Sequence, residues 1–354
     1  MSISVFEHPF LAQLFGDDEE ILSLFTAAAD ISEMLRFETA LAEAQADLGL
    51  IPVEAGQAIR QAAETFEPNL SELAKATARD GVVVPSFVNE LRKTVGNGHG
   101  EYVHFGATSQ DVIDTSLILR LKRAAAILSG RLQQLAQRFD WLDAAFGKNR
   151  LTGYTRMQAA IPITVSDRIA SWRQPLGDYE ARLNAVVFPV QFGGAAGTLE
   201  KFADDGAALR KLLADRLELH DGPQWHSQRA FPVEFGNLLS LVTGTLGKFG
   251  QDIALMAELG AELSLTGGGG SSAMPHKQNP IAAETLVGLA RFNAAQMGGL
   301  HQAMLHEQER SGAAWMVEWM ILPQIVASTG SVLNIASALI DKIARIGNEQ
   351  PPNI

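Results

Sequence analysis

The sequence contains no cysteine among its 354 residues. A chain without cysteine cannot form a disulfide, ligate zinc through thiolates or use a thiol as its nucleophile. Disulfides belong to oxidising compartments, so their exclusion fits a reducing environment, and we expect a cytoplasmic protein.

Positive charge is also scarce. Lys and Arg number 28 against 40 Asp and Glu, a formal net charge of −12. No basic face is indicated, so we expect no nucleic-acid partner.

Residues 1–15 contain no basic segment followed by an apolar run, so no signal peptide is expected. Residues 319–340 lack Lys, Arg, Asp and Glu, but they include proline, glutamine, asparagine and several hydroxyl side chains. That stretch is too polar for lipid, and we predict a helix buried in a bundle or between subunits, with no membrane contact.

Aromatic residues make up only 7% of the chain, and apolar residues rarely alternate with period two. Instead they recur at steps of three and four over long segments. These segments are Ile118 to Phe139, Ile169 to Val186, Phe235 to Met256, 282–305 and 316–342. Such seams predict an all-α fold built on a central bundle of about five long helices.

The bundle suggests a division of the chain into three parts. Residues 1–107 are expected to form a small helical N-terminal domain, residues 108–345 the bundle, and residues 346–354 a tail. No cofactor motif interrupts this plan, because the glycine run at 96–100 has the wrong spacing for a dinucleotide fingerprint.

One stretch is chemically conspicuous. Four glycines, Gly267 to Gly270, lead into Ser271 and Ser272, and two prolines then bracket Lys277 and Asn279. Glycines let the backbone approach a ligand closely, so this stretch predicts a mobile arm that carries hydroxyls over a bound substrate. A plain Gly/Ser linker is the alternative. A linker does not explain the ammonium group of Lys277 or the amide of Asn279, which suit a substrate carboxylate.

The run from Gly270 to Pro280 resembles the signature of the fumarase/aspartase superfamily. The resemblance implies that Ser271 transfers the proton and that Lys277 and Asn279 hold a substrate carboxylate, with Ser272 beside them. It also implies a homotetramer in which each site draws its motifs from three subunits. Many members carry a further C-terminal helical domain, which this sequence is expected to lack or to have in shortened form.

A second motif precedes the first long helix. Thr108 and Ser109 are good helix N-cap residues, so the simple interpretation is a well-capped helix. Hydroxyls and free N–H groups at a helix N-terminus also bind anions. The block resembles the first conserved region of the superfamily, which implies that Thr108 and Ser109 hold a substrate carboxylate. His104 matches a histidine found in two branches of the superfamily, and it is expected either to contact substrate or to be structural.

The third motif, from Gly153 to Thr164, resembles the second conserved region, but Arg156 stands where many members have a catalytic histidine. With a pKa above about 12, arginine cannot shuttle protons near neutrality. It can neutralise a carboxylate through two N–H donors, so the reacting group should be one that needs no proton. We expect Arg156 and Gln158 to bind substrate carboxylates, and we expect His226 and Arg229, in a further matching block, to face the site.

This departure favours the lactonising branch of the superfamily, the 3-carboxy-cis,cis-muconate cycloisomerases of aromatic-acid breakdown through protocatechuate. The resemblance implies a small, substituted muconate as substrate and neither metal nor organic cofactor. Because the guanidinium of Arg156 would also suit a tetrahedral sulfonate, 3-sulfomuconate is expected as an additional substrate. Two alternatives remain open at this point. One is a lyase that releases fumarate from a carbon–nitrogen bond, and the other is a helical scaffold without activity.

Overall fold

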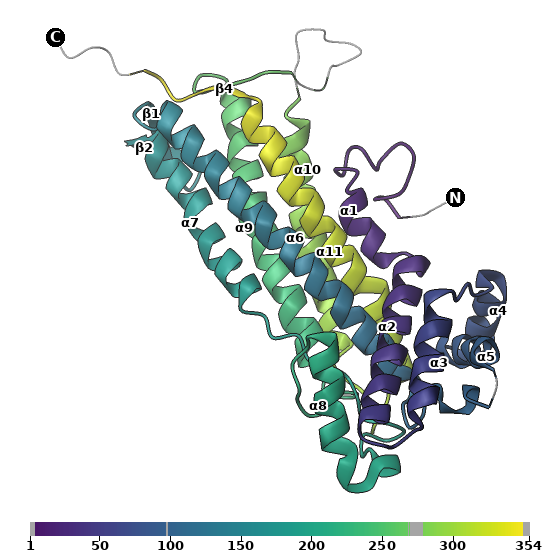
Figure 1. Cartoon of the computed structure of the whole chain (residues 1–354). Coiled ribbons are helices and arrows are strands. Elements are labelled where there is room, and N and C mark those ends of the chain that lie inside the picture. Colours follow the sequence, from purple (N-terminus) through teal and green to yellow (C-terminus); the bar gives the residue numbers. More distant parts are fainter. Residues whose placement is uncertain (1–3, 97, 268, 270–278, 350–354) are drawn as a thin grey trace.

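The computed structural model describes residues 4–96, 98–267, 269 and 279–349. Within them, five long helices run side by side as an elongated bundle (Figure 1). They are α6 (Ser109–Phe146), α7 (Val165–Asn184), α9 (Ala230–Leu259), α10 (Ile281–Gln302) and α11 (Gly312–Asp341). All five coincide with segments that the apolar periodicity predicted, so the all-α bundle is confirmed.

The bundle core is apolar and tightly packed. Phe139, Trp172 and Phe249 from three helices form edge-to-face and tilted ring contacts with centroids 4.9–6.1 Å apart. The indole N–H of Trp172 donates to Asp252 Oδ2 at 2.7 Å, so the buried ring keeps a hydrogen bond. Helices α9 and α10 approach closely because Gly250 has no side chain, and a Cβ there would lie 2.6 Å from the carbonyl oxygen of Ala283.

A second apolar core lies at one end of the bundle, beneath the shorter helices. The elements there are α2 (Ala27–Asp47), α3 (Val53–Glu64), α4 (Leu70–Asp80), α5 (Val84–Val95), η2 (Gly100–Tyr102), η3 (Glu200–Asp205) and α8 (Gly206–Leu217). The short α1 (Glu19–Leu22) and η1 (Ser23–Phe25) pack against the bundle core instead. This core joins α2, α3 and α5 to the segment 190–225 and to the start of α6. The first turns of α6 are therefore fixed from several sides.

The opposite end of the bundle carries two small antiparallel sheets, which the near absence of period-two patterns did not predict. Strand β1 (Arg150–Thr155) pairs with β2 (Gln158–Thr164), and β3 (Leu263–Leu265) pairs with β4 (Ile343–Ile346). Strand β2 is exposed over most of its length, so it has no buried apolar face to produce an alternating pattern.

Helix α11 contains the uncharged stretch. By length and composition it could cross a membrane, with a mean hydropathy of 1.3 over its most apolar window. However, 67% of that window is buried inside the molecule, where α11 packs against α6, α9 and α10. This burial agrees with the prediction of a helix buried within the bundle.

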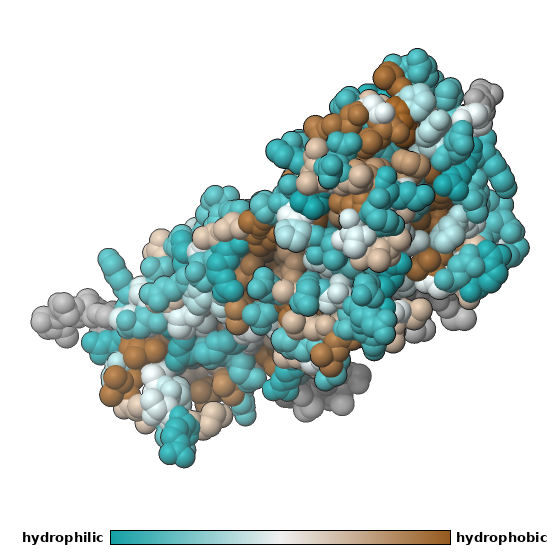
Figure 2. Space-filling model, turned by 90° about the horizontal axis from the view of Figure 1, so that it is seen from below, coloured by the Kyte–Doolittle hydropathy of each residue, from teal (hydrophilic) through white to brown (hydrophobic). Residues whose placement is uncertain are grey.

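The surface of the bundle is not uniformly polar. Figure 2 shows hydrophobic residues among hydrophilic ones along the elongated molecule. Large apolar side chains are exposed on β1, β2 and the connection between them, on α6 and on α11. They are Tyr154, Met157, Ile161, Trp141, Met316 and Met320.

Candidate active site

The N-terminus of α6 is the first part of the candidate site. Thr108 is the N-cap residue, as predicted, with extended backbone angles (φ −125°, ψ 161°). Its backbone N–H donates to Asp111 Oδ2 at 3.0 Å. Ser109 begins the helix, and both hydroxyl residues are partly exposed. The helix start therefore offers two hydroxyls and free N–H groups to an anion, with the positive end of the helix dipole behind them.

Asp111 organises the surroundings of that helix start. Its fully buried carboxylate accepts the backbone N–H groups of Gly193 and Gly194 at 2.9 and 3.0 Å. It also contacts Nε2 of His226 at 2.8 Å. One carboxylate thus joins α6, the glycine-rich segment after residue 190 and the segment before α9. The glycines are required here, because a Cβ on Gly193 would lie 2.8 Å from the His226 ring.

His226, which the sequence analysis expected to face the site, lies at this end of the bundle, is 1% exposed and is hydrogen-bonded within the chain. Its Nδ1 is buried and has no hydrogen-bond partner among the described residues. His226 therefore lies next to Thr108 and Ser109, and its contact with the helix start is made through Asp111.

Arg229 is buried and fully engaged. Its guanidinium donates to Asp114 at 2.6 and 3.0 Å, to Glu318 at 2.8 and 2.6 Å, and to the carbonyl oxygen of Trp225 at 3.4 Å. Arginine has five N–H donors, so none is left for a substrate. The side chain clamps α6, α9 and α11 together, and direct substrate contact does not fit this arrangement.

Glu318 shows the electrostatic effect of this clamp. Burial by itself raises the pKa of Glu318, but the hydrogen bond and charge of Arg229, with a contribution from His306, lower it overall. Trp315 adds an indole N–H to Asp114 at 3.0 Å. The cluster therefore favours the ionised form of the Glu318 carboxylate below the surface.

His104 lies in the turn before α6. Its Nδ1 is 2.7 Å from Oε1 of Glu38 on α2. The side chain of His104 is 14% exposed and that of Glu38 is 1% exposed. Burial lowers the pKa of His104, but the charge and hydrogen bond of Glu38, with the charge of Asp111, raise it overall. A charged imidazolium at this position would suit an anionic ligand.

Arg156 and Gln158 lie at the other end of the molecule, on the β1–β2 hairpin (Figure 1). Arg156 and Met157 form its two-residue turn, with φ values of +49° and +64°. Such turns favour asparagine and glycine, and larger residues with positive φ are uncommon. Arg156 and Gln158 are both exposed, so the single chain does not enclose the cation.

Asn279 lies at the same end, at the start of α10. Its backbone forms two hydrogen bonds with that of Gly269, at 3.0 and 3.2 Å. Ser271, Ser272 and Lys277 lie outside the described residues.

The predicted site residues therefore fall into two groups. Thr108, Ser109, His104, His226 and Arg229 gather where α6 begins, and Arg156, Gln158 and Asn279 gather near where it ends. Helix α6 has 38 residues, so it is about 57 Å long. No small molecule can contact both groups within one chain.

Sequence reasoning did not single out four residues that shape the first group. Glu38, Asp114 and Glu318 are buried carboxylates, and their occurrence within apolar helical faces was the available signal. Arg310 is exposed and donates from Nε to Gln110 Oε1 at 3.0 Å, next to Ser109. It supplies a further cation close to the proposed anion site.

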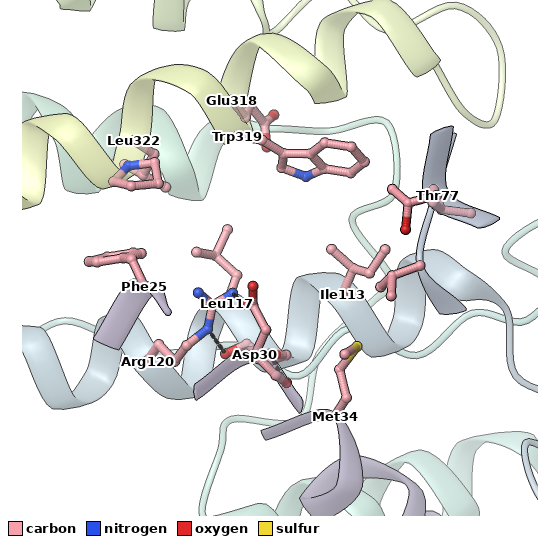
Figure 3. Close-up of a pocket in the computed structure, with 14 residues that line it drawn as sticks. Phe25, Asp30, Met34, Thr77, Ile113, Leu117, Arg120, Glu318, Trp319 and Leu322 are labelled. Carbon is pink, nitrogen blue, oxygen red and sulfur yellow. Dashed lines mark hydrogen bonds and ion pairs between the residues drawn. The ribbon is translucent and has the colours of Figure 1, made fainter. Parts of the chain in front are cut away.

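A cavity of about 490 Å³ lies behind this end of α6, between α2, α6 and α11 (Figure 3). Its walls are mainly apolar and include Phe25, Leu117 and Leu322. Buried Arg120 and partly exposed Asp30, 2.7 Å apart, supply most of its charge. Because that cation is already neutralised, the cavity is poorly suited to a multiply charged anion, and it includes none of the predicted site residues.

Within the described part of the chain, no group of three or more acidic or histidine side chains could hold a metal ion.

The comparison with known families identifies the class to which this protein belongs. The family model described as Lyase matches residues 17–292. The chain belongs to this lyase family, and the resemblance to the fumarase/aspartase superfamily is thereby confirmed.

Individual relatives have related activities. The 3-carboxy-cis,cis-muconate cycloisomerase of Acinetobacter baylyi is 34% identical over 339 residues, which cover 91% of this chain and 75% of that protein. The nitrosuccinate lyase of Streptomyces davaonensis is 34% identical over 332 residues, which cover 88% of this chain and 70% of that protein. The crystal structure of the 3-carboxy-cis,cis-muconate lactonizing enzyme from Pseudomonas putida is similar with a TM-score of 0.86 at 35% identity, covering 92% of this chain and 75% of that one.

Proposed function

We propose that this protein is a 3-carboxy-cis,cis-muconate cycloisomerase that closes its substrate to 4-carboxymuconolactone in the cytoplasm. The observation that carries the proposal is Arg156 at the exposed tip of the β1–β2 hairpin. A permanent cation there can bind a carboxylate through two N–H donors but cannot relay protons. This chemistry suits a reaction in which a carboxylate attacks or leaves. The curated and structural relatives that carry the cycloisomerase name support the same choice.

In the proposed reaction one substrate carboxylate adds to a conjugated double bond. The new C–O bond leaves the electron pair on the neighbouring carbon, and the adjoining carboxylate takes up the charge. Thr108, Ser109, Lys277 and Asn279 would stabilise that charge with N–H and O–H donors. Ser271 would then give its proton to the carbanion, with Ser272 beside it.

The remaining groups bind and position the substrate. Arg156 and Gln158 would hold its other carboxylates, and His104 would donate to the anion at the start of α6. His226 and Arg229 would act indirectly, through the contacts with Asp111, Asp114 and Glu318 described above.

A complete site then requires more than one chain. The two groups of site residues lie at opposite ends of the bundle, and apolar side chains on the hairpin are exposed. We propose a homotetramer in which the hairpin of one subunit and the glycine-rich arm of another complete the site at the α6 N-terminus of a third. A fixed guanidinium also suits a tetrahedral sulfonate, so 3-sulfomuconate would be a second substrate.

The test is a panel of substrates followed in the ultraviolet. The purified protein should remove the absorbance of 3-carboxy-cis,cis-muconate, and NMR should identify the lactone product. The rival candidate is a fumarate-releasing lyase, which the nitrosuccinate lyase at 34% identity favours. Release of fumarate from nitrosuccinate or a succinylated amine, with 3-carboxymuconate left unchanged, would contradict the proposal.

A further inference from the structure

The contact between Glu38 and His104 joins two segments 66 residues apart in the sequence. Glu38 lies in the middle of α2 and is almost fully buried, and its Oε1 is 2.7 Å from Nδ1 of His104. The contact therefore fixes which imidazole nitrogen faces α2. Nε2 is the ring nitrogen left for a ligand.

The backbone holds this ring in an uncommon conformation. His104 has a φ of +63°, and Gly106, two residues later, has a φ of +72°. The carbonyl oxygen of His104 accepts from the N–H of Ala107 at 3.3 Å, which closes the turn immediately before Thr108. The imidazole is thus attached to the same rigid turn that presents the α6 N-terminus.

Three charged groups act on the ring. Glu38 from α2 and Asp111 from α6 favour its protonated form, whereas burial and Arg92 from α5 oppose it. Arg92 directs one N–H to the carbonyl oxygen of Val103 at 3.0 Å, so part of its charge is engaged next to the turn. The two carboxylates outweigh burial and Arg92, and the pKa of His104 is raised.

We propose that Glu38 is a positioning residue, which keeps His104 as an imidazolium and leaves its Nε2–H to donate to an anion bound at the start of α6. The inference rests on the proposed function for the nature of that anion, a carboxylate of the muconate. It assigns a role to a carboxylate on α2 that lies outside all three sequence motifs.

The charge state of His104 can be measured without substrate. Mass spectrometry of hydrogen–deuterium exchange at the imidazole Cε1, followed against pH, gives the titration midpoint of each histidine. In the wild-type protein the midpoint of His104 should lie above the ordinary value of about 6.5. In Glu38→Gln it should fall by about one pH unit or more, because the opposite charge is lost while burial remains. A wild-type midpoint at or below 6.5, or an unchanged midpoint in Glu38→Gln, overturns the proposal.

Anion binding gives the second readout. Calorimetry with tricarballylate, a stable tricarboxylate, should show weaker binding to Glu38→Gln at pH 7.5, by about tenfold. The difference between the two proteins should narrow at pH 5.5, where a larger fraction of His104 is protonated in the variant. The matched control is Glu33→Gln, which removes another buried carboxylate from α2, one that faces Arg36 and Arg123. If Glu38→Gln does not fold, Glu38→Asp is the substitute. It keeps the negative charge, so the titration midpoint of His104 should stay raised.

These outcomes separate the inference from the proposed function. If 3-carboxymuconate is not turned over but the midpoint and the affinity shift as stated, the proposed substrate is wrong and the role of Glu38 holds. If 3-carboxymuconate is turned over and Glu38→Gln alters neither the basic limb of the kcat/KM profile nor the affinity for tricarballylate, Glu38 is only structural.

Discussion

At the scale of single residues, Arg229 links three helices through five hydrogen bonds to two carboxylates and one carbonyl. Removing one partner of a buried ion cluster leaves the other charges without compensation, which costs about 3–5 kcal/mol. We expect Arg229→Met to lower the free energy of unfolding by that amount, measured by urea unfolding at fixed protein concentration. Arg173→Met is the control, because Arg173 pairs with Asp140 near the surface. It should cost about 1 kcal/mol or less, and equal losses in the two variants would contradict the account.

The pairing of His104 with Glu38 predicts a pH dependence of stability. The pKa of His104 in the folded protein is raised above the ordinary histidine value of about 6.5. The pairing therefore contributes stability that is complete below about pH 6.5 and is lost as the pH rises through the folded-state value. The destabilisation caused by Glu38→Gln should be larger at pH 6 than at pH 9 in denaturant titrations. The same loss at both pH values would show that the imidazole is not charged in the folded protein.

At the scale of elements, the sequence predicted the long helices better than it predicted the strands. Apolar residues at steps of three and four identify a helix wherever one face is buried, as in α6 and α9. Strand β2 is largely exposed within the chain, so the hairpin that carries Arg156 had no apolar alternation to reveal it.

The sequence predicted only those features of the candidate site that depend on neighbouring residues. Thr108 as N-cap follows from neighbouring residues. The partners of Asp111 and Arg229 come from segments 115 and 89 residues away, at His226 and Glu318. No local pattern specifies such pairs, because they exist only once the helices have packed.

The exposed hairpin predicts an interface. Met157 and Ile161 are 74% and 66% exposed, which is unusual for large apolar side chains on a projecting element. We expect Ile161→Asp to dissociate the assembly into smaller species in sedimentation velocity and to reduce activity with it. Val53→Asp is the control, since Val53 is 55% exposed and begins α3, where a negative charge is tolerated. A wild-type protein that sediments as a monomer would contradict the proposed interface.

At the scale of the whole molecule, the two groups of site residues lie near opposite ends of α6, a helix about 57 Å long. Ser271→Ala should be inactive, because loss of a proton donor typically costs about 10²–10⁴-fold in rate. A variant such as Arg156→Leu, which is impaired in substrate binding but still carries Ser271, can then complement Ser271→Ala. Mixed, dissociated and reassembled with Arg156→Leu, the Ser271→Ala protein should recover activity toward 3-carboxymuconate. Recovery requires sites that draw these two residues from different subunits, and a mixture as inactive as its components would contradict the composite site.

Arg156 is the residue from which the proposed chemistry was inferred. A guanidinium that binds the third acidic substituent should make unsubstituted cis,cis-muconate a poor substrate, because the cation in the assembled site would be left unpaired. Arg156→Lys keeps the charge but loses the planar fork, so kcat/KM should fall for 3-carboxymuconate and 3-sulfomuconate alike.

The most direct measurement of the central claim is the ratio of kcat/KM for 3-carboxymuconate to that for cis,cis-muconate, in the wild-type protein and in Arg156→Leu. We predict a wild-type ratio of about 100 or more and a ratio near one in the variant, since leucine offers no donor to the substituent. A ratio that is the same in both proteins would show that Arg156 does not bind the third substituent and would contradict the account.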